Sequence, residues 1–161
     1  HPQGHTDLLT AEPKSLRVTR ARTIRLAKAE NKRVPDPLLC SFNIEALALM
    51  FVVAGAGVAQ ALVRLWRDGA VDLRTRLTPD PAGVSAPIKC PDRYAAADRF
   101  DTAASHLDSA LAYDDDECWV RQELATLWPE FVATSPGELT KARTVAAAKT
   151  KSLRVTTGGV L

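Results

Sequence analysis

The stretch RTIRLAKAENKRVPDPLLCSFNIEALAL, residues 22–49, decides the fold of this chain. It begins as a basic run rich in helix-forming residues, passes Pro35 and Pro37, and continues as an apolar run that contains one acid, Glu45. Proline cannot continue a helix, and it pushes the residue before it towards an extended conformation. The stretch therefore predicts two helices, over residues 14–33 and 42–54, joined by a sharp turn, with Ser41 as the N-cap of the second.

The rest of the chain predicts further helices and no sheet. We expect helices over residues 58–67, 92–113 and 116–128, the first ended by Gly69, with a proline-rich loop over residues 77–91. No segment alternates apolar and polar residues in the way that a half-buried strand requires. The sequence therefore predicts an all-α fold, a helical bundle.

The helix over residues 42–54 is expected at the centre of that bundle. Its side chains after Glu45 are apolar on nearly every face, which is typical of a helix surrounded by others. We therefore expect Leu47, Met50 and Phe51 to be almost completely buried.

Length and composition restrict the class of protein. The chain has 161 residues, of which 25% are charged, and its formal net charge is only +2, so it has the size of one domain and is no general polyanion binder. The scattered cysteines form no C-x-x-C pair, which argues against a disulfide framework or a zinc site and favours a reducing, cytoplasmic compartment. They are Cys40, Cys90 and Cys118.

One uncharged run has the minimum length of a membrane helix. Residues 46–63 carry no charge, and about 18 apolar residues are the lower limit for crossing a bilayer. However, alanines, Gln60 and the pair Gly55 and Gly57 dilute the run. We interpret the segment from Gly55 to Gly57 as a break between two buried helices, and we expect no membrane contact.

Charge is concentrated on the first helix. Residues 14–33 hold eight basic residues and one acid, a net charge of +7. At about 100° per residue, five of the basic residues fall within roughly 140° of arc and form one basic face. They are Arg17, Arg20, Arg25, Lys28 and Lys32.

The turn between the first two helices predicts an anion site. The N-terminus of a helix attracts anions through its free N–H groups and its dipole. Ser41 can donate a hydroxyl there, and Lys28 can supply a positive charge from the preceding helix. The ring of Phe42 offers a face on which a base could stack. The simpler alternative is that Lys28 is a surface lysine, Ser41 only a cap and Phe42 only a core residue.

These residues also carry a resemblance. The pattern R-x-x-R-L-x-K-x-x-N-K, a proline turn and then S-F-N-I-E-A-L resembles the helical C-terminal half of template-independent nucleotidyltransferases. The most similar type is the cGAS-like bacterial signalling synthases, or CD-NTases, with the oligoadenylate synthases as their relatives. Three further segments are similar to the family and stand in the same order as there: HPQGH at residues 1–5, DPAG at residues 80–83 and LWPEF at residues 127–131. The resemblance therefore covers residues 1–133.

The resemblance implies a role for each residue of the turn. Lys28 and Ser41 would contact the triphosphate of the donor nucleotide, and Phe42 would stack on its base. Glu45 would have an orienting or structural role, and we expect Arg25 and Lys32 to support the site with their charge. The implied function is nucleotide second-messenger synthesis, of cyclic or linear oligonucleotides, in bacterial antiphage signalling, with nucleoside triphosphates as ligands.

The chain departs from the family in its catalytic residues. Family members hold two Mg²⁺ ions with a D-x-D pair and a third acid, after a Gly-Ser turn on an N-terminal α/β lobe. The only D-x-D here, Asp114 to Asp116, follows no predicted strand, and its acids are typical of a helix N-terminus. We therefore expect no catalytic or metal-binding residue in this chain, and Mg²⁺ only through the N-terminal lobe.

The expected domain organisation follows from this departure. Residues 1–13 would be the connection between lobes, residues 14–133 the helical domain, and residues 134–161 a basic tail with one helix. The first residue is not methionine, which favours removal of the catalytic lobe; otherwise that lobe belongs to a separate chain. By itself the chain would then be inactive.

Two other classes of function stay open. Arg99 and His106 have the spacing of the catalytic pair in HEPN-type metal-free ribonucleases, in which histidine acts as the base and arginine stabilises the phosphorane. A pair this short is a weak signal, and a helical histidine is more often a packing residue. Alternatively, the chain is a stand-alone binding module whose basic face, from Arg17 to Lys32, docks RNA or an acidic protein.

Overall fold

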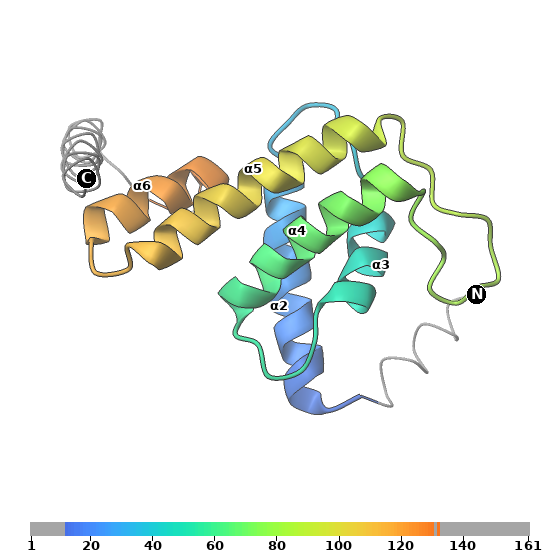
Figure 1. The fold of residues 1–161 in the computed structure, drawn as a ribbon, viewed down its shortest axis with the longest axis horizontal. Helices are drawn as coiled ribbons and strands as arrows, with labels where there is room; N and C mark the ends of the chain where they lie inside the picture. The colour runs from blue at the N-terminus through green and yellow to red at the C-terminus, as the bar shows by residue number, and fades with distance from the viewer. Residues whose placement is uncertain (1–11, 131, 133–161) are drawn as a thin grey trace, which may run out of the picture. The chain divides into compact units, whose positions relative to one another are not determined.

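The computed structural model describes residues 12–130 and residue 132, and these residues form an all-α fold, as predicted. They contain no strand, only one isolated antiparallel bridge between Thr78 and Ile88. The expected tail helix over residues 134–161 lies outside the described residues. The helices, shown in Figure 1, are α2 (Lys14–Asn31), α3 (Ser41–Phe51), α4 (Val58–Thr75), α5 (Arg93–Ala112) and α6 (Glu117–Leu127).

The chain packs as two compact units, His1–Ser105 and His106–Leu161. In the first unit α2, α3 and α4 contact one another in every pairing, and Figure 1 shows α4 lying across α2. Residues 93–105 of α5 complete this unit, with Phe100 buried against α4. The core of the first unit is therefore built from four helical segments.

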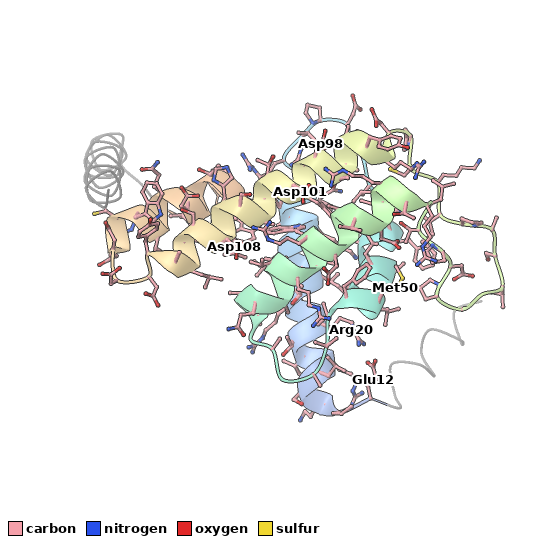
Figure 2. The ribbon with its side chains drawn as sticks, in the orientation of Figure 1. Glu12, Arg20, Met50, Asp98, Asp101 and Asp108 are labelled. Carbon is pink, nitrogen blue, oxygen red and sulfur yellow. The ribbon has the colours of Figure 1, made fainter. Side chains whose placement is uncertain are left out.

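The inner residues of α3 are buried, as the apolar pattern predicts, but the end of the helix is not. Ile44 and Leu47 have no exposed surface. Met50 and Phe51, which we expected to be buried, are partly exposed, so that prediction was wrong. Both lie in the last turn of α3, where Met50 reaches the protein surface beside Arg76 (Figure 2). The apolar side chains of this last turn are therefore only partly covered by the rest of the described chain.

The predicted end of α4 at Gly69 is also wrong, because the helix continues to Thr75. A Cβ added at Gly69 would lie 3.1 Å from a ring carbon of Phe100, which is closer than most real Cβ contacts. Any larger residue at this point would press on the Phe100 ring, so glycine favours the close contact between α4 and Phe100. By contrast, the predicted break at Gly55 is confirmed, since this glycine has φ of 86° between α3 and α4.

Arg74 adds a polar contact between α4 and α5. Its guanidinium forms ion pairs of 2.7 Å with Asp98 and with Asp101, which lie on neighbouring turns of α5 (Figure 2). All three side chains are substantially exposed, so these pairs add little stability. These ion pairs are at the surface, whereas the contact between Gly69 and Phe100 is buried.

The inner face of α2 is polar. Arg20, Thr23, Glu30 and Asn31 are buried there together with Ala27. Arg20 was predicted on the exposed basic face, but it is only 3% exposed and pairs with the carboxylate of Glu12 (Figure 2). A buried arginine needs such a partner, because an uncompensated buried charge is very costly.

Glu30 links α2 to α5 through Arg99. The Arg99 Nη2 atom donates to the Glu30 carboxylate at 2.8 Å and to the Glu30 backbone carbonyl at 2.6 Å, while Nε donates to the carboxylate at 3.1 Å. The Glu30 side chain is 6% exposed, so this is a nearly buried and multiply hydrogen-bonded pair. The Glu30 carbonyl, near the C-terminal end of α2, also accepts the backbone N–H of Arg33 at 3.2 Å, so Arg99 adds a second donor there.

The loop after α4 is braced by one aspartate. The Asp80 carboxylate accepts hydrogen bonds from the backbone N–H groups of Ala82, Val84 and Ser85, at 3.1, 3.2 and 2.9 Å. Gly83 has φ of 67°, the left-handed conformation that glycine adopts most readily. The DPAG motif therefore forms a turn that its own aspartate braces.

The second unit contains the end of α5 and α6. Asp116 is the N-cap of α6, and its carboxylate accepts from the Trp119 N–H at 3.0 Å, which is the helix-terminal role predicted for these acids. The indole N–H of Trp119 donates to Ser109 at 2.9 Å. Among the residues described in both units, no helix has the length and apolar character that crossing a membrane requires.

Candidate functional site

The corner between α2 and α3 brings together a lysine and a glutamate. Lys28, in the last turn of α2, donates from its ammonium group to the Glu45 carboxylate of α3. The side chain of Lys28 is 25% exposed and that of Glu45 is 41% exposed, so solvent and ligands can reach the pair. The positive charge expected at this corner is therefore present, and a carboxylate holds it in place.

Ser41 lies on the same side of α3 as this pair. It is the first residue of α3 and is exposed. Ser41 and Glu45 are four residues apart, so their side chains project from one face of the helix. Because Glu45 binds Lys28, the lysine ammonium and the serine hydroxyl lie beside the same face of α3. No hydrogen bond engages that hydroxyl within the described part of the chain.

Phe42 follows Ser41 and is partly buried. The N-cap of α3 is Cys40, so the prediction that Ser41 is the cap was wrong by one position. The reason is Asn43, whose side-chain oxygen accepts from both the backbone N–H and the thiol of Cys40, each at 3.1 Å. Ser41 is thereby released from a capping role, and its hydroxyl stays available for a ligand.

Asn31 fixes the connection between the two helices, a role that we did not assign from the sequence. Its amide donates to the Leu39 carbonyl at 2.7 Å, and both residues are buried. This bond joins the end of α2 to the residue before the α3 cap, across the segment that contains Pro35 and Pro37. In the sequence, Asn31 is the asparagine near the end of the pattern R-x-x-R-L-x-K-x-x-N-K.

Arg25 and Lys32, the predicted supporting residues, lie on the exposed surface of α2. They are three residues before and four residues after Lys28, so the three side chains share one side of the helix. Neither forms an ion pair with any residue that the structure describes. They can therefore add positive potential beside the Lys28–Glu45 pair.

Arg99 and His106, the pair considered for a ribonuclease site, have separate partners. Arg99 is engaged by Glu30, as described above. His106 lies in the second unit, where its Nδ1 atom is 2.7 Å from the carboxylate of the buried Glu123. Each side chain thus has a structural partner of its own, and the ribonuclease interpretation gains no support from these contacts.

The described residues offer no cluster for a divalent metal. Nowhere in residues 12–130 do three or more histidine, cysteine, aspartate or glutamate side chains gather. Asp116 caps α6 instead. Within the part of the chain that the structure describes, no set of side chains fits the two Mg²⁺ ions of nucleotidyl transfer.

Comparisons with known proteins give no relatives. No protein-family model, no curated protein and no solved structure matches this chain.

Proposed function

We propose that this chain is the helical lobe of a template-independent nucleotidyltransferase and that it binds the donor nucleoside triphosphate at the α2–α3 corner. The observation that carries the proposal is that the partly exposed Lys28–Glu45 pair and the exposed Ser41 lie beside one face of α3. A lysine, a hydroxyl and the first N–H groups of a helix are together a suitable environment for phosphate oxygens.

In this proposal Glu45 holds the lysine while no nucleotide is bound. A triphosphate carries several negative charges, so it competes well with a single carboxylate for the Lys28 ammonium. Ser41 then donates its hydroxyl to a phosphate oxygen, and the ring of Phe42 lies next to it for contact with the base. Arg25 and Lys32 attract the anion to the corner.

The chemistry itself would belong to an N-terminal α/β catalytic lobe, in the same polypeptide or in a separate one. Mg²⁺ would bind there, because the described residues of this chain offer no set of carboxylates for it. With that lobe, the enzyme would make cyclic or linear oligonucleotide messengers, and antiphage signalling in bacteria is the role that fits the resemblance in residues 22–49. The site and the chemistry are then divided between two lobes.

Replacing Lys28 by alanine tests the proposed site. A hydrogen bond to a charged group contributes about 1.5–3 kcal/mol, so Lys28→Ala should weaken ATP binding about tenfold or more. Titration of ¹⁵N-labelled chain with ATP gives the dissociation constant and locates the site through the Ser41 and Phe42 amide shifts. Ser41→Ala should weaken binding as well.

Arg22→Ala is the matched control for this experiment. Arg22 is a basic residue on the exposed surface of α2, about 120° around the helix from Lys28. Its removal lowers the net charge equally and should leave ATP binding nearly unchanged. If both variants lose affinity to the same extent, or if ATP shifts amides elsewhere, the α2–α3 corner is not the nucleotide site.

A second candidate function rests on the outer face of α2. Glu30, the one acid of this helix, is turned inward to Arg99, so every charged residue on the exposed side is basic. At about 1.5 Å per residue the charges extend over roughly 27 Å, enough to follow a nucleic acid backbone. We define the outer face of α2 as the exposed basic residues of this helix and of the two residues after it: Lys14, Arg17, Arg22, Arg25, Lys32 and Arg33.

A binding module that docks RNA through this outer face would depend strongly on salt. If all six side chains contact phosphates, the logarithm of the binding constant for single-stranded RNA should fall with the logarithm of salt concentration with a slope of about −4. Fluorescence anisotropy with an RNA oligonucleotide measures this slope. Replacing Arg22 and Arg33 by glutamine should reduce it by about 1.4. A slope near zero would exclude the module.

A further inference from the structure

A hollow in the first unit lies between the end of α4 and the start of α5. Residues 75–77 and 90–94 line it, and its volume is about 440 Å³. Sites for small molecules commonly have volumes of about 300–1,000 Å³. None of the residues proposed for nucleotide binding belongs to this lining, so the hollow is a separate feature of the molecule.

Arg93 supplies a fixed positive charge to the hollow. Its Nη1 atom donates to the carbonyls of Leu73 and Arg74 at 3.1 and 2.9 Å, and its Nη2 atom donates to the Tyr94 hydroxyl at 3.0 Å. These acceptors are all uncharged, and they use three of the five guanidinium N–H groups. Within the described residues Arg93 has no carboxylate partner, so the protein orients its charge without neutralising it.

Arg76 supplies a second guanidinium. Its Nε atom donates to Asp72 at 2.8 Å, and its Nη2 atom lies 3.9 Å from the sulfur of Met50. These two contacts leave the N–H groups of Nη1 available, and the side chain is 54% exposed. Two guanidinium groups, one held by Asp72 and one by backbone carbonyls, therefore border the same small space.

The remaining lining is mainly apolar or neutral. Tyr94 is 56% exposed and Leu77 is 40% exposed, so both side chains are open to a ligand. Burial raises the pKa of the Cys90 thiol, so this group stays uncharged near neutral pH. Asp92 is the one acid of the lining, and its carboxylate already accepts the Ala95 N–H at 2.9 Å.

The lining therefore combines a net positive charge with an exposed aromatic ring. The two arginines and one aspartate of the lining give +1, and Asp72, outside the lining, pairs with Arg76, so Arg93 carries the charge that no carboxylate offsets. The Arg93 guanidinium lies 4.6 Å from the centre of the Tyr94 ring. We propose that the hollow binds a small aromatic anion. Its phosphate or carboxylate group pairs with Arg76 and Arg93, and its ring packs against Tyr94 and Leu77.

Phenyl phosphate is a suitable probe for this proposal. It should bind more tightly than inorganic phosphate, which lacks the ring, and more tightly than phenol, which lacks the charge. In ¹⁵N-labelled chain it should shift the amides of Leu77, Arg93 and Tyr94. Shifts confined to other residues, or equal binding of all three compounds, would overturn the proposal.

Arg76→Gln and Arg64→Gln form a matched pair of variants. Arg76 pairs with Asp72 and is 54% exposed, whereas Arg64 pairs with Asp68 and is 53% exposed, and both lie on or just after α4. Loss of a charged hydrogen bond should weaken phenyl phosphate binding about tenfold in Arg76→Gln. Arg64→Gln should have no effect, and equal effects of both would contradict the proposal.

Two further measurements keep the test independent of stability. Tyr94→Ala removes an exposed ring, leaves the Arg93 contacts with Leu73 and Arg74 in place, and should also weaken binding.

Bound phenyl phosphate should slow alkylation of Cys90 by iodoacetamide and leave alkylation of Cys118, in α6, unchanged, as measured by mass spectrometry of peptides. Unchanged alkylation of Cys90 at saturating probe would mean that the probe is not in the hollow. Because ATP binding at the α2–α3 corner has its own variants, either proposal can fail alone.

Discussion

Lys28 and Glu45 neutralise each other at the α2–α3 corner while no ligand is bound. For an anion this is a cost, because the carboxylate must be displaced or must share the lysine. It is also an advantage, since a lysine on a flexible four-carbon stem is held in one orientation before the ligand arrives. The pair thus predicts a site that favours multiply charged phosphates over small monovalent anions.

The Glu12–Arg20 pair should make stability depend on pH. The hydrogen bond from Arg20 lowers the pKa of the Glu12 carboxyl below its ordinary value of about 4.3. A carboxylate with a lowered pKa stabilises the fold above the unfolded pKa, and this contribution is lost as the pH falls through the folded pKa. We expect the midpoint of urea unfolding to decrease below about pH 4.3. Glu12→Gln should be less stable at pH 7 and should show a smaller decrease, whereas parallel curves would contradict this role.

Lys28 and Ser41 were singled out from residue type and from their spacing around the prolines, and Glu45 from the resemblance. The contact between Lys28 and Glu45 was not predicted, because it forms only when the two helices pack together. The burial of Arg20 was not predictable from spacing, because Arg20 and Arg25 both fall on the predicted basic face of the helix. What separates them is Glu12, which precedes the helix and reaches Arg20 only in the folded chain. The functions assigned to Lys28, Ser41 and Phe42 stay predictions.

At the scale of the helices, Gly69→Ala should destabilise the protein. In an exposed helix this change is favourable by up to about 1 kcal/mol, because glycine is a poor helix former. Here the new Cβ would meet the Phe100 ring at 3.1 Å, and overpacking of a core typically costs about 1–3 kcal/mol. Urea unfolding of the purified variant measures the difference in the free energy of unfolding.

Phe100→Leu provides the control for that contact. Alone it should destabilise the protein, since it removes part of a fully buried ring. Combined with Gly69→Ala, it should cost less than the sum of the two single changes, because the smaller side chain makes room for the Cβ. Strict additivity would show that α4 and α5 do not meet at Gly69 in the way described.

Helix ends were predictable where the cause lies in the neighbouring residues. Proline or an acidic cap ends or starts α2, α5 and α6 close to the predicted positions. Gly69 has the same local signature as a helix end, and it continues the helix because its partner Phe100 comes from another helix. The N-cap of α3 was displaced by one residue because Asn43 can reach back to Cys40.

At the scale of the whole molecule, we expect residues 1–161 alone to transfer no nucleotide with any divalent metal. Two-metal catalysis needs carboxylates that hold both ions, and the described residues contain no such cluster. Incubation with ATP, GTP and Mg²⁺, followed by chromatography of the products, tests this. A cyclic or linear oligonucleotide product would contradict it and would point to Asp114–Asp116. ATP binding without turnover is the expected result.

The polar inner face of α2 determines the register of this helix against its neighbours. Apolar side chains as small as Ala27 would tolerate a slide along the groove, but a slip of one residue would rotate Glu30 by about 100° away from Arg99 and leave a buried charge unpaired. Asn31 would likewise lose Leu39. We therefore expect substitutions at Glu30 and Asn31 to disturb how α2 packs, whereas substitutions of its exposed basic residues should affect ligand binding and leave the packing intact.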